Sequence, residues 1–130
     1  MSPIGIVTAW LAAINGHDVP ALVSLMTPDH VFIDSLGNKV RGASSMEPGW
    51  RGYFAMCPDY WIRADHLLVS EDTVLAAGEA GGTINTHPWR TPAAFKAVVT
   101  ISTVKMKAVF RIVHLEVSQQ MQQPRQSMID

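Results

Sequence analysis

The stretch YWIRADHLLV, residues 60–69, decides the fold, because the spacing of apolar residues changes there from the helical period to a period of two. Successive side chains of a strand point to opposite faces, so one face is expected to carry Tyr60, Ile62, Ala64, His66 and Leu68. Further strands are expected at residues 73–83, 91–101 and 104–117. The sequence therefore predicts a run of four antiparallel strands from residue 60 onward.

Two helices are expected at the start of the chain, where apolar residues recur at helical spacing. Ser2 is expected to cap the first helix, with Pro3 at its first position and Gly16 at its end. Asp18 is expected to cap the second, shorter helix, which stops at residues 27–29.

A strand at residues 30–35 and a turn at residues 37–38 are expected next. A third helix is expected to begin with a capping box from Ser44 to Glu47, with Pro48 tolerated in its first turn. This order predicts an α+β domain, in which the helices pack on one face of a curved sheet. If the helices cover only part of the concave face, a hollow remains between them and the sheet.

The composition indicates one domain with few charges to cover its surface. The chain has 130 residues, of which 48% are hydrophobic and only 16% are charged, against the usual ~25%. A subunit interface or a sizeable apolar pocket is therefore expected. We assign residues 1–117 to a single domain and residues 118–130, which are rich in Gln, to a polar C-terminal tail.

Charge, cysteine and histidine content argue against several classes of function. The net charge is −1 and Lys and Arg do not cluster, so nucleic acid is not an expected partner. The single cysteine, Cys57, excludes an internal disulfide, and the five histidines lack the tight spacing of metal ligands. We expect no metal and no cofactor. No signal peptide and no membrane-spanning run are evident, which predicts a cytoplasmic protein without a membrane partner.

Five short segments carry a resemblance to a known family. They are VTAWLAAINGHD (7–18), LMTPDHVFID (25–34), RG (41–42), YF (53–54) and WRTPAAF (89–95). In this order, over residues 4–117, they resemble the SnoaL-like domains of the nuclear transport factor 2-like superfamily. The resemblance implies a cone-shaped fold, with three N-terminal helices on a curved, mostly antiparallel sheet. It also implies a deep pocket between helices and sheet, and a homodimer.

Asp34 is the candidate catalytic base. It is a lone carboxylate after the apolar residues Val31, Phe32 and Ile33, and burial would raise its pKa toward that of a useful base. In the resemblance it stands where the ketosteroid isomerase branch keeps its proton-shuttling aspartate. The alternative interpretation is a polar residue at the end of a strand that bonds to its neighbours in the turn.

Two departures from the isomerases concern the groups that would stabilise an oxyanion. The isomerases keep a tyrosine on the first helix, and Trp10 stands in the similar place here. They also keep a second, protonated aspartate on a later strand, and the matching residues 91–95 contain no acid. The usual pair of oxyanion donors is therefore not expected.

Two histidine regions are further candidates. His66 would point into the hollow if its face of the strand is concave, where it could serve as the partner acid or donor for Asp34; a histidine with a structural or surface role is the alternative. His87 and Trp89 flank Pro88 in an expected loop near the pocket mouth, where they could bind a ligand; an ordinary turn anchored by the tryptophan is the alternative. His17 and His30 border turns, and we interpret them as structural or exposed.

Six aromatic residues are the candidates for ligand binding, against the alternative that they only fill the core. They are Trp10, Trp50, Tyr53, Phe54, Trp89 and Phe95. A wall of such side chains suits a flat apolar ligand.

Together these features predict a cofactor-independent enzyme of the isomerase or cyclase type, which abstracts a proton from a hydrophobic cyclic carbonyl compound. Asp34 would be the base, and Trp10, Tyr53 or His66 would donate to the developing oxyanion. The alternative is a non-catalytic module that binds a hydrophobic small molecule. A third possibility is an adaptor for other proteins, which would require a large exposed apolar patch.

Overall fold

The computed structural model describes residues 2–33, 37–100 and 105–111 of the chain. Its helices are α1 (Pro3–Asn15), α2 (Val19–Ser24) and α3 (Ala43–Met56). Its strands are β1 (Met26–Ile33), β2 (Lys39–Arg41), β3 (Trp61–Ser70), β4 (Thr73–Ile84), β5 (His87–Thr100) and β6 (Lys105–Arg111). The element order confirms the predicted α+β domain.

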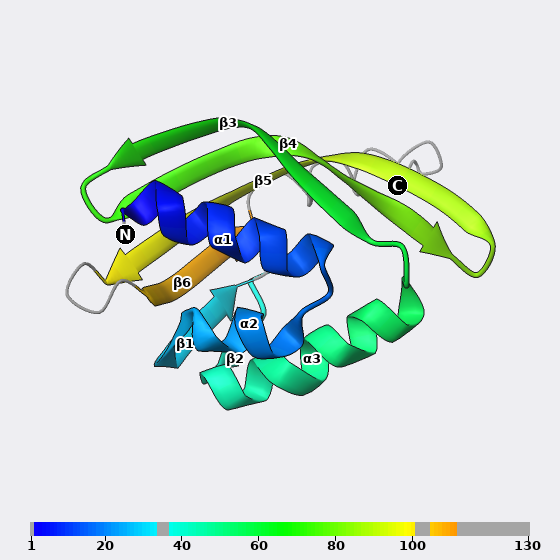
Figure 1. Ribbon diagram of the computed structural model, residues 1–130, viewed down its shortest axis with the longest axis horizontal. Coiled ribbons are helices and arrows are strands. Elements are labelled where there is room, and N and C mark those ends of the chain that lie inside the picture. Colours follow the sequence, from blue (N-terminus) through cyan, green and yellow to red (C-terminus); the bar gives the residue numbers. More distant parts are fainter. Residues whose placement is uncertain (1, 34–36, 101–104, 112–130) are drawn as a thin grey trace.

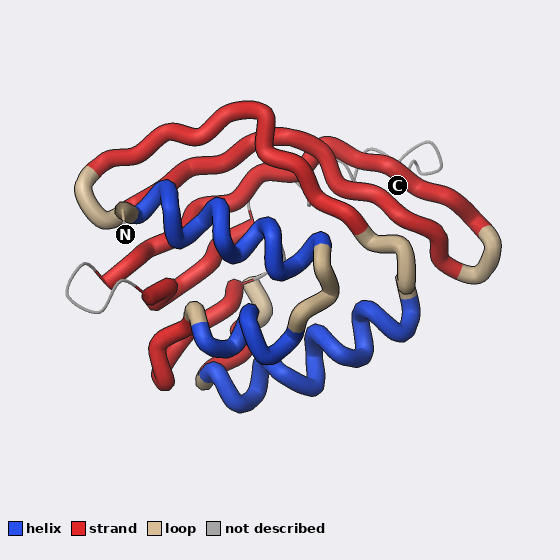
Figure 2. Tube along the Cα trace, viewed as in Figure 1, coloured by secondary structure: helices blue, strands red, loops and turns tan. Residues whose placement is uncertain are grey.

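The strands form a single sheet in the order β2-β1-β6-β5-β4-β3. Neighbouring strands pair antiparallel, except that β1 and β6 are parallel. The sheet curves over α1, and the helices gather on its concave side (Figures 1 and 2). The hairpin of β1 and β2 is called the early hairpin. The parallel pairing of β1 with β6 brings this hairpin beside the end of the described chain and completes the cone.

The first two helix starts are formed by the predicted caps. The Ser2 hydroxyl accepts a hydrogen bond from the Gly5 N–H at 3.1 Å, and the Asp18 carboxylate accepts one from the Ala21 N–H at 3.1 Å. Each cap satisfies a backbone donor that the first turn of a helix leaves without a partner. Both predictions are confirmed.

The predicted start of the third helix is wrong. Gly42 precedes the helix with φ of 91°, a conformation that favours glycine, and the helix begins at Ala43 without a side-chain cap. Glu47 pairs instead with Arg51 at 3.0 Å, one turn further on. Pro48 therefore lies inside the helix rather than in its first turn.

The single face predicted for residues 60–68 is interrupted by a bulge. The register between β3 and β4 shifts between Ala64 and His66, so the alternation of side chains changes there. Leu68, expected beside Tyr60 and Ile62, is 67% exposed. Gly78 lies opposite the bulge, and a Cβ atom at this position would overlap the carbonyl oxygen of Arg63.

The expected loop at residues 87–89 is part of strand β5. The turn lies one step earlier, at Asn85 and Thr86, which both have positive φ, 50° and 66°. Such a two-residue turn matches the twist of a hairpin, and the strands pair directly on either side of it, from Ile84 opposite His87.

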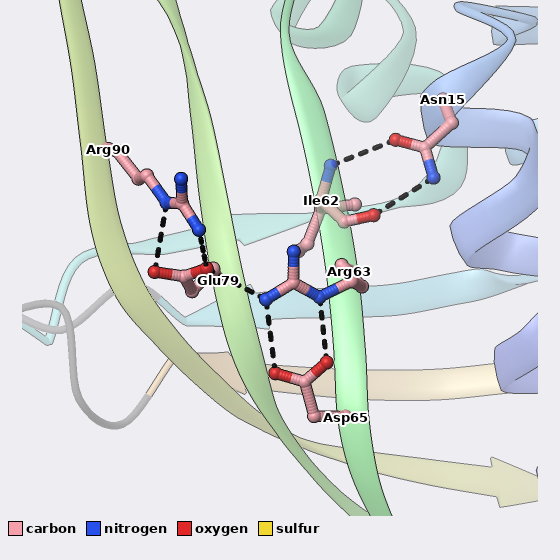
Figure 3. A network of polar contacts seen from close by, with 6 residues as sticks. All are labelled: Asn15, Ile62, Arg63, Asp65, Glu79 and Arg90. Carbon is pink, nitrogen blue, oxygen red and sulfur yellow. Dashed lines mark hydrogen bonds and ion pairs between the residues drawn. The ribbon is translucent and has the colours of Figure 1, made fainter.

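A network of charged side chains ties β3, β4 and β5 together (Figure 3). The Glu79 carboxylate accepts hydrogen bonds from Arg90 at 2.6 Å and from Arg63 at 2.7 Å, and Arg63 also binds Asp65. The bonds from Arg90 and then from Arg63 lower the pKa of Glu79 to about 2. These side chains face solvent, so the network aligns the strands more than it stabilises the fold.

Asn15 joins the end of α1 to the edge strand β3. Its side-chain oxygen accepts from the Ile62 N–H at 2.8 Å, and its side-chain nitrogen donates to the Ile62 carbonyl at 2.9 Å. The pair of bonds satisfies backbone groups that an edge strand would otherwise leave open. It also holds Ile62 in place at the wall of the hollow described below.

The helices leave the outer face of the sheet uncovered. Leu68 and Leu75, which pair with each other across β3 and β4, are exposed there, near the hairpin that joins the two strands. The homodimer that the resemblance implies stays a prediction. Among the described helices, none is both long and apolar enough to cross a bilayer.

His30 is buried in β1 and has a structural contact, as expected. Its Nδ1–H donates to the Met106 carbonyl at 2.9 Å, and its Nε2 has no partner among the described residues. Burial is the main cause that lowers the pKa of His30 below its ordinary value of 6.5; the Met106 bond and Asp29 oppose it.

We expect the stability of the protein to fall as the pH drops below about 6.5, because the unfolded chain then binds a proton that folded His30 does not. The slope can reach about 1.4 kcal/mol per pH unit, the limit for one proton. Urea denaturation between pH 7.5 and 5.5 measures it. A His30→Gln variant should have a shallower slope, whereas His66→Gln, an exposed site, should keep the wild-type slope. Equal slopes for wild type and His30→Gln would refute the assignment.

Candidate active site

A cavity of about 230 Å³ opens between α3, the early hairpin and the start of β3. Its wall is mostly apolar and consists of Phe32, Val40, Ser45, Met46, Gly49, Trp50, Tyr53 and Tyr60. Val40, Ser45 and Gly49 are exposed and mark the mouth. We call this space the outer cavity.

A second, smaller cavity of about 40 Å³ lies deeper, against α1 and the sheet. Its wall consists of Trp10, Ile14, Phe32, Trp50, Tyr60, Ile62, Ala93, Ala94, Phe95 and Val109. Phe32, Trp50 and Tyr60 line both cavities, so the two spaces are neighbours that share these three side chains. We call this space the inner cavity.

Aromatic rings in edge-on contact connect the walls of the two cavities. The Trp10 ring meets Trp50 with centroids 6.3 Å apart and Phe95 with centroids 5.1 Å apart. Tyr53 meets both Trp50 and Tyr60, with centroids 6.4 and 4.9 Å apart. These contacts hold large side chains in fixed orientations around the hollow.

The polar atoms of this wall include hydrogen-bond donors without acceptors. The indole N–H groups of Trp10 and Trp50 are buried, and neither has a partner among the described residues. A buried donor without a partner costs about 1–3 kcal/mol, so an acceptor brought by a ligand would be favourable. Among the described lining residues of either cavity, none is Asp, Glu, Lys, Arg or His.

Four of the six predicted ligand-binding residues line a cavity. They are Trp10, Trp50, Tyr53 and Phe95. Phe54 does not; its ring stacks on His17, with centroids 4.2 Å apart and planes 5° apart. Trp89 packs against Tyr60 and borders an open surface hollow instead.

The two predicted catalytic residues are not brought together in the described part of the chain. His66 follows the bulge in β3, is exposed, and lines neither cavity. Asp34 lies outside the described residues, directly after the last residue of β1, and its role stays a prediction from the sequence.

Two of the three side chains shared by the cavities were not among the predicted binding residues. Phe32 and Tyr60 line both cavities, although they are 28 positions apart and come from different ends of the fold. Each stands in a strand-like run of apolar residues, a pattern shared with ordinary core positions. Their common role depends on the pairing of distant strands, which no local pattern encodes.

No metal centre is found in the described part of the chain, since no group of three or more His, Cys, Asp or Glu side chains there could hold an ion. Cys57 is a free, buried thiol. Its sulfur lies 3.7 Å from an Asp59 carboxylate oxygen, and the same carboxylate accepts from the Thr83 N–H and hydroxyl. This cluster is structural: the Thr83 bonds lower the pKa of Asp59 and anchor the entry to β3.

Comparisons with known proteins give consistent results. A family model for the SnoaL-like domain matches residues 7–114. A candidate SnoaL-like polyketide cyclase from Shewanella denitrificans has 14% sequence identity and a TM-score of 0.80, over 92% of this chain and 96% of that one. A search of curated proteins finds no match.

Two further solved structures share the fold. A hypothetical protein with a ketosteroid isomerase-like fold from Catenulispora acidiphila, in complex with trimethylamine, has 21% identity and a TM-score of 0.69, over 82% of each chain. An uncharacterized cystatin-fold protein from Novosphingobium aromaticivorans has 25% identity and a TM-score of 0.74, over 86% of this chain and 98% of that one. The structural likeness agrees with the element order described above.

Proposed function

The chain belongs to the SnoaL-like domain family, and from this premise we propose that it is a cofactor-independent enzyme of the isomerase or cyclase type. The substrate of the proposed reaction is a hydrophobic cyclic ketone. A base removes a proton from the carbon next to the carbonyl group, and an enolate forms. The proton then returns at another carbon, or the enolate carbon attacks a second carbonyl group within the same molecule, whose C=O π bond opens to an alkoxide that takes up the proton from the base.

The observation that carries this proposal is the aromatic hollow with the unpartnered Trp10 N–H. Removal of the proton moves negative charge to the carbonyl oxygen, so a donor aimed at that oxygen lowers the barrier. A well-placed oxyanion donor lowers the barrier by about 3 kcal/mol. The Trp10 indole is buried and without a partner among the described residues, which supports this role.

The base in this proposal is Asp34, and its support comes from the sequence. Asp34 stands two positions after Phe32, which lines both cavities. No other carboxylate is available from the described lining residues. A base is needed for carbon acids at neutral pH, and a carboxylate in an apolar environment has the raised pKa that this task requires.

The described lining residues include no carboxylate. This favours a second candidate function, a module that binds the ketone without converting it. Both candidates use the same hollow and the same indole donors. They differ only in whether the bound ketone exchanges its protons.

Deuterium exchange distinguishes the two candidates. Cyclic ketones of one to four rings are incubated with the protein in D₂O, and mass spectrometry follows the uptake of deuterium next to the carbonyl group. The enzyme proposal expects uptake faster than with heat-unfolded protein at the same concentration. Saturable binding of a ketone without faster uptake would leave the binding module as the function.

A further inference from the structure

We infer that the two cavities form one divided site, in which a compound of one or two rings fills the outer cavity while its carbonyl oxygen enters the inner cavity beside Trp10 and Trp50. The inference rests on the proposed function for the location of the site, but it concerns binding alone. It adds a second hydrogen-bond donor to the site, and it adds a limit on the size and on the charge of the ligand.

The outer cavity sets the size limit. A cavity of about 150 Å³ takes up one benzene ring, so the 230 Å³ of the outer cavity suits one substituted ring or two small fused rings. A rigid compound of four fused rings exceeds this space. It would have to leave most of its apolar surface in water, outside the mouth formed by Val40, Ser45 and Gly49.

The inner cavity is too small for a ring and has the size of an oxygen-bearing group. Its 40 Å³ is well below the ~150 Å³ of a cavity that takes up benzene. It shares Phe32, Trp50 and Tyr60 with the outer cavity, so a group projecting from a ring in the outer cavity lies next to it.

The wall of the inner cavity selects a hydrogen-bond acceptor. The indole N–H of tryptophan only donates, and those of Trp10 and Trp50 are both buried without a partner among the described residues. The two rings are in edge-on contact, with centroids 6.3 Å apart, and both residues line the inner cavity. A carbonyl oxygen that enters this cavity brings two lone pairs as acceptors for these donors.

The charge of the wall disfavours an anionic ligand. Among the described lining residues, none carries a positive charge that could pair with a carboxylate. An anionic ligand would lose its hydration without compensation and would meet the Asp34 carboxylate of the proposed function. The ligand class is therefore a ketone of one or two rings without an acidic group.

Calorimetric binding of three probes tests this inference. 2-Tetralone has two rings and a carbonyl group, tetralin has the same rings without oxygen, and androst-4-ene-3,17-dione has four rings and two carbonyl groups. 2-Tetralone is expected to bind at least tenfold more tightly than tetralin, and the four-ring dione more weakly than either. Equal affinity for 2-tetralone and tetralin would overturn the role of the donors, and tightest binding of the dione would overturn the size limit.

Three matched variants identify the donors. Trp10→Phe and Trp50→Phe each keep an aromatic ring and remove the N–H, so each should reduce the preference for 2-tetralone over tetralin to less than threefold. Trp61→Phe, at a tryptophan that lines neither cavity, should keep the full preference. If the inner cavity holds only water, all three variants will keep the preference for 2-tetralone over tetralin, and the inference is wrong. Selective binding without deuterium uptake would reject the catalytic proposal and leave this inference standing.

Discussion

An Asp34→Asn variant is expected to lose ketone proton exchange by roughly 10²- to 10⁴-fold, the usual contribution of a general base. Asparagine has nearly the shape of aspartate but cannot accept a proton at neutral pH. The affinity for 2-tetralone should stay within about twofold of wild type, because the hollow and its indole donors contribute the binding. Deuterium uptake measures the first quantity and calorimetry the second.

Asp29→Asn is the matched control, since Asp29 is a carboxylate of β1, five positions before Asp34, and is exposed. It should exchange ketone protons at the wild-type rate. If Asp34→Asn exchanges as fast as wild type, Asp34 is not the base. If the exchange rate falls equally in both variants, the effect comes from the loss of a negative charge and not from the loss of a base.

A Gly78→Ala variant is expected to lose about 2–3 kcal/mol of unfolding free energy, as for an overpacked core site. A Cβ atom at Gly78 would overlap the Arg63 carbonyl oxygen and lie 2.8 Å from the carbonyl carbon and 3.0 Å from the Ala64 Cα. These are backbone atoms of the bulge in β3, so relief requires a shift of the β3–β4 pairing. The midpoint of urea denaturation measures the loss.

Gly52→Ala provides the opposite expectation. Gly52 lies within α3, and a Cβ atom there would meet nothing within 4 Å. Alanine should raise the stability by about 0.5–1 kcal/mol, because glycine is unfavourable inside a helix. If Gly78→Ala is as stable as wild type while Gly52→Ala shows the expected gain, the bulge accommodates the added Cβ atom and the expected loss is refuted.

Local features of this fold could be predicted, because short-range contacts determine them. The caps at Ser2 and Asp18 bind backbone groups three residues further on, so the residue types alone indicate them. The predicted start of α3 was wrong because the same residue types also fit a helix interior. Gly42 precedes the helix with a positive φ, so the helix already begins at Ala43 and Ser44 cannot cap it.

Features that depend on pairing between distant segments could not be predicted. The bulge between Ala64 and His66 interrupts an alternation that looks regular in the sequence, and it moves His66 away from the hollow. The aromatic residues were recognised as a set, but not the division of the hollow. That division requires Phe32, Trp50 and Tyr60, from three parts of the chain, to meet at one wall.

The most direct test of the divided site is the spectrum of the indole N–H groups. Four tryptophans give four indole signals in a ¹H–¹⁵N correlation spectrum, and Trp→Phe variants assign them. On addition of 2-tetralone, the signals of Trp10 and Trp50 should move downfield, as expected for new hydrogen bonds to oxygen, while Trp61 stays in place. Tetralin should not produce these downfield shifts. Unchanged signals of Trp10 and Trp50 at saturating 2-tetralone would contradict the divided site.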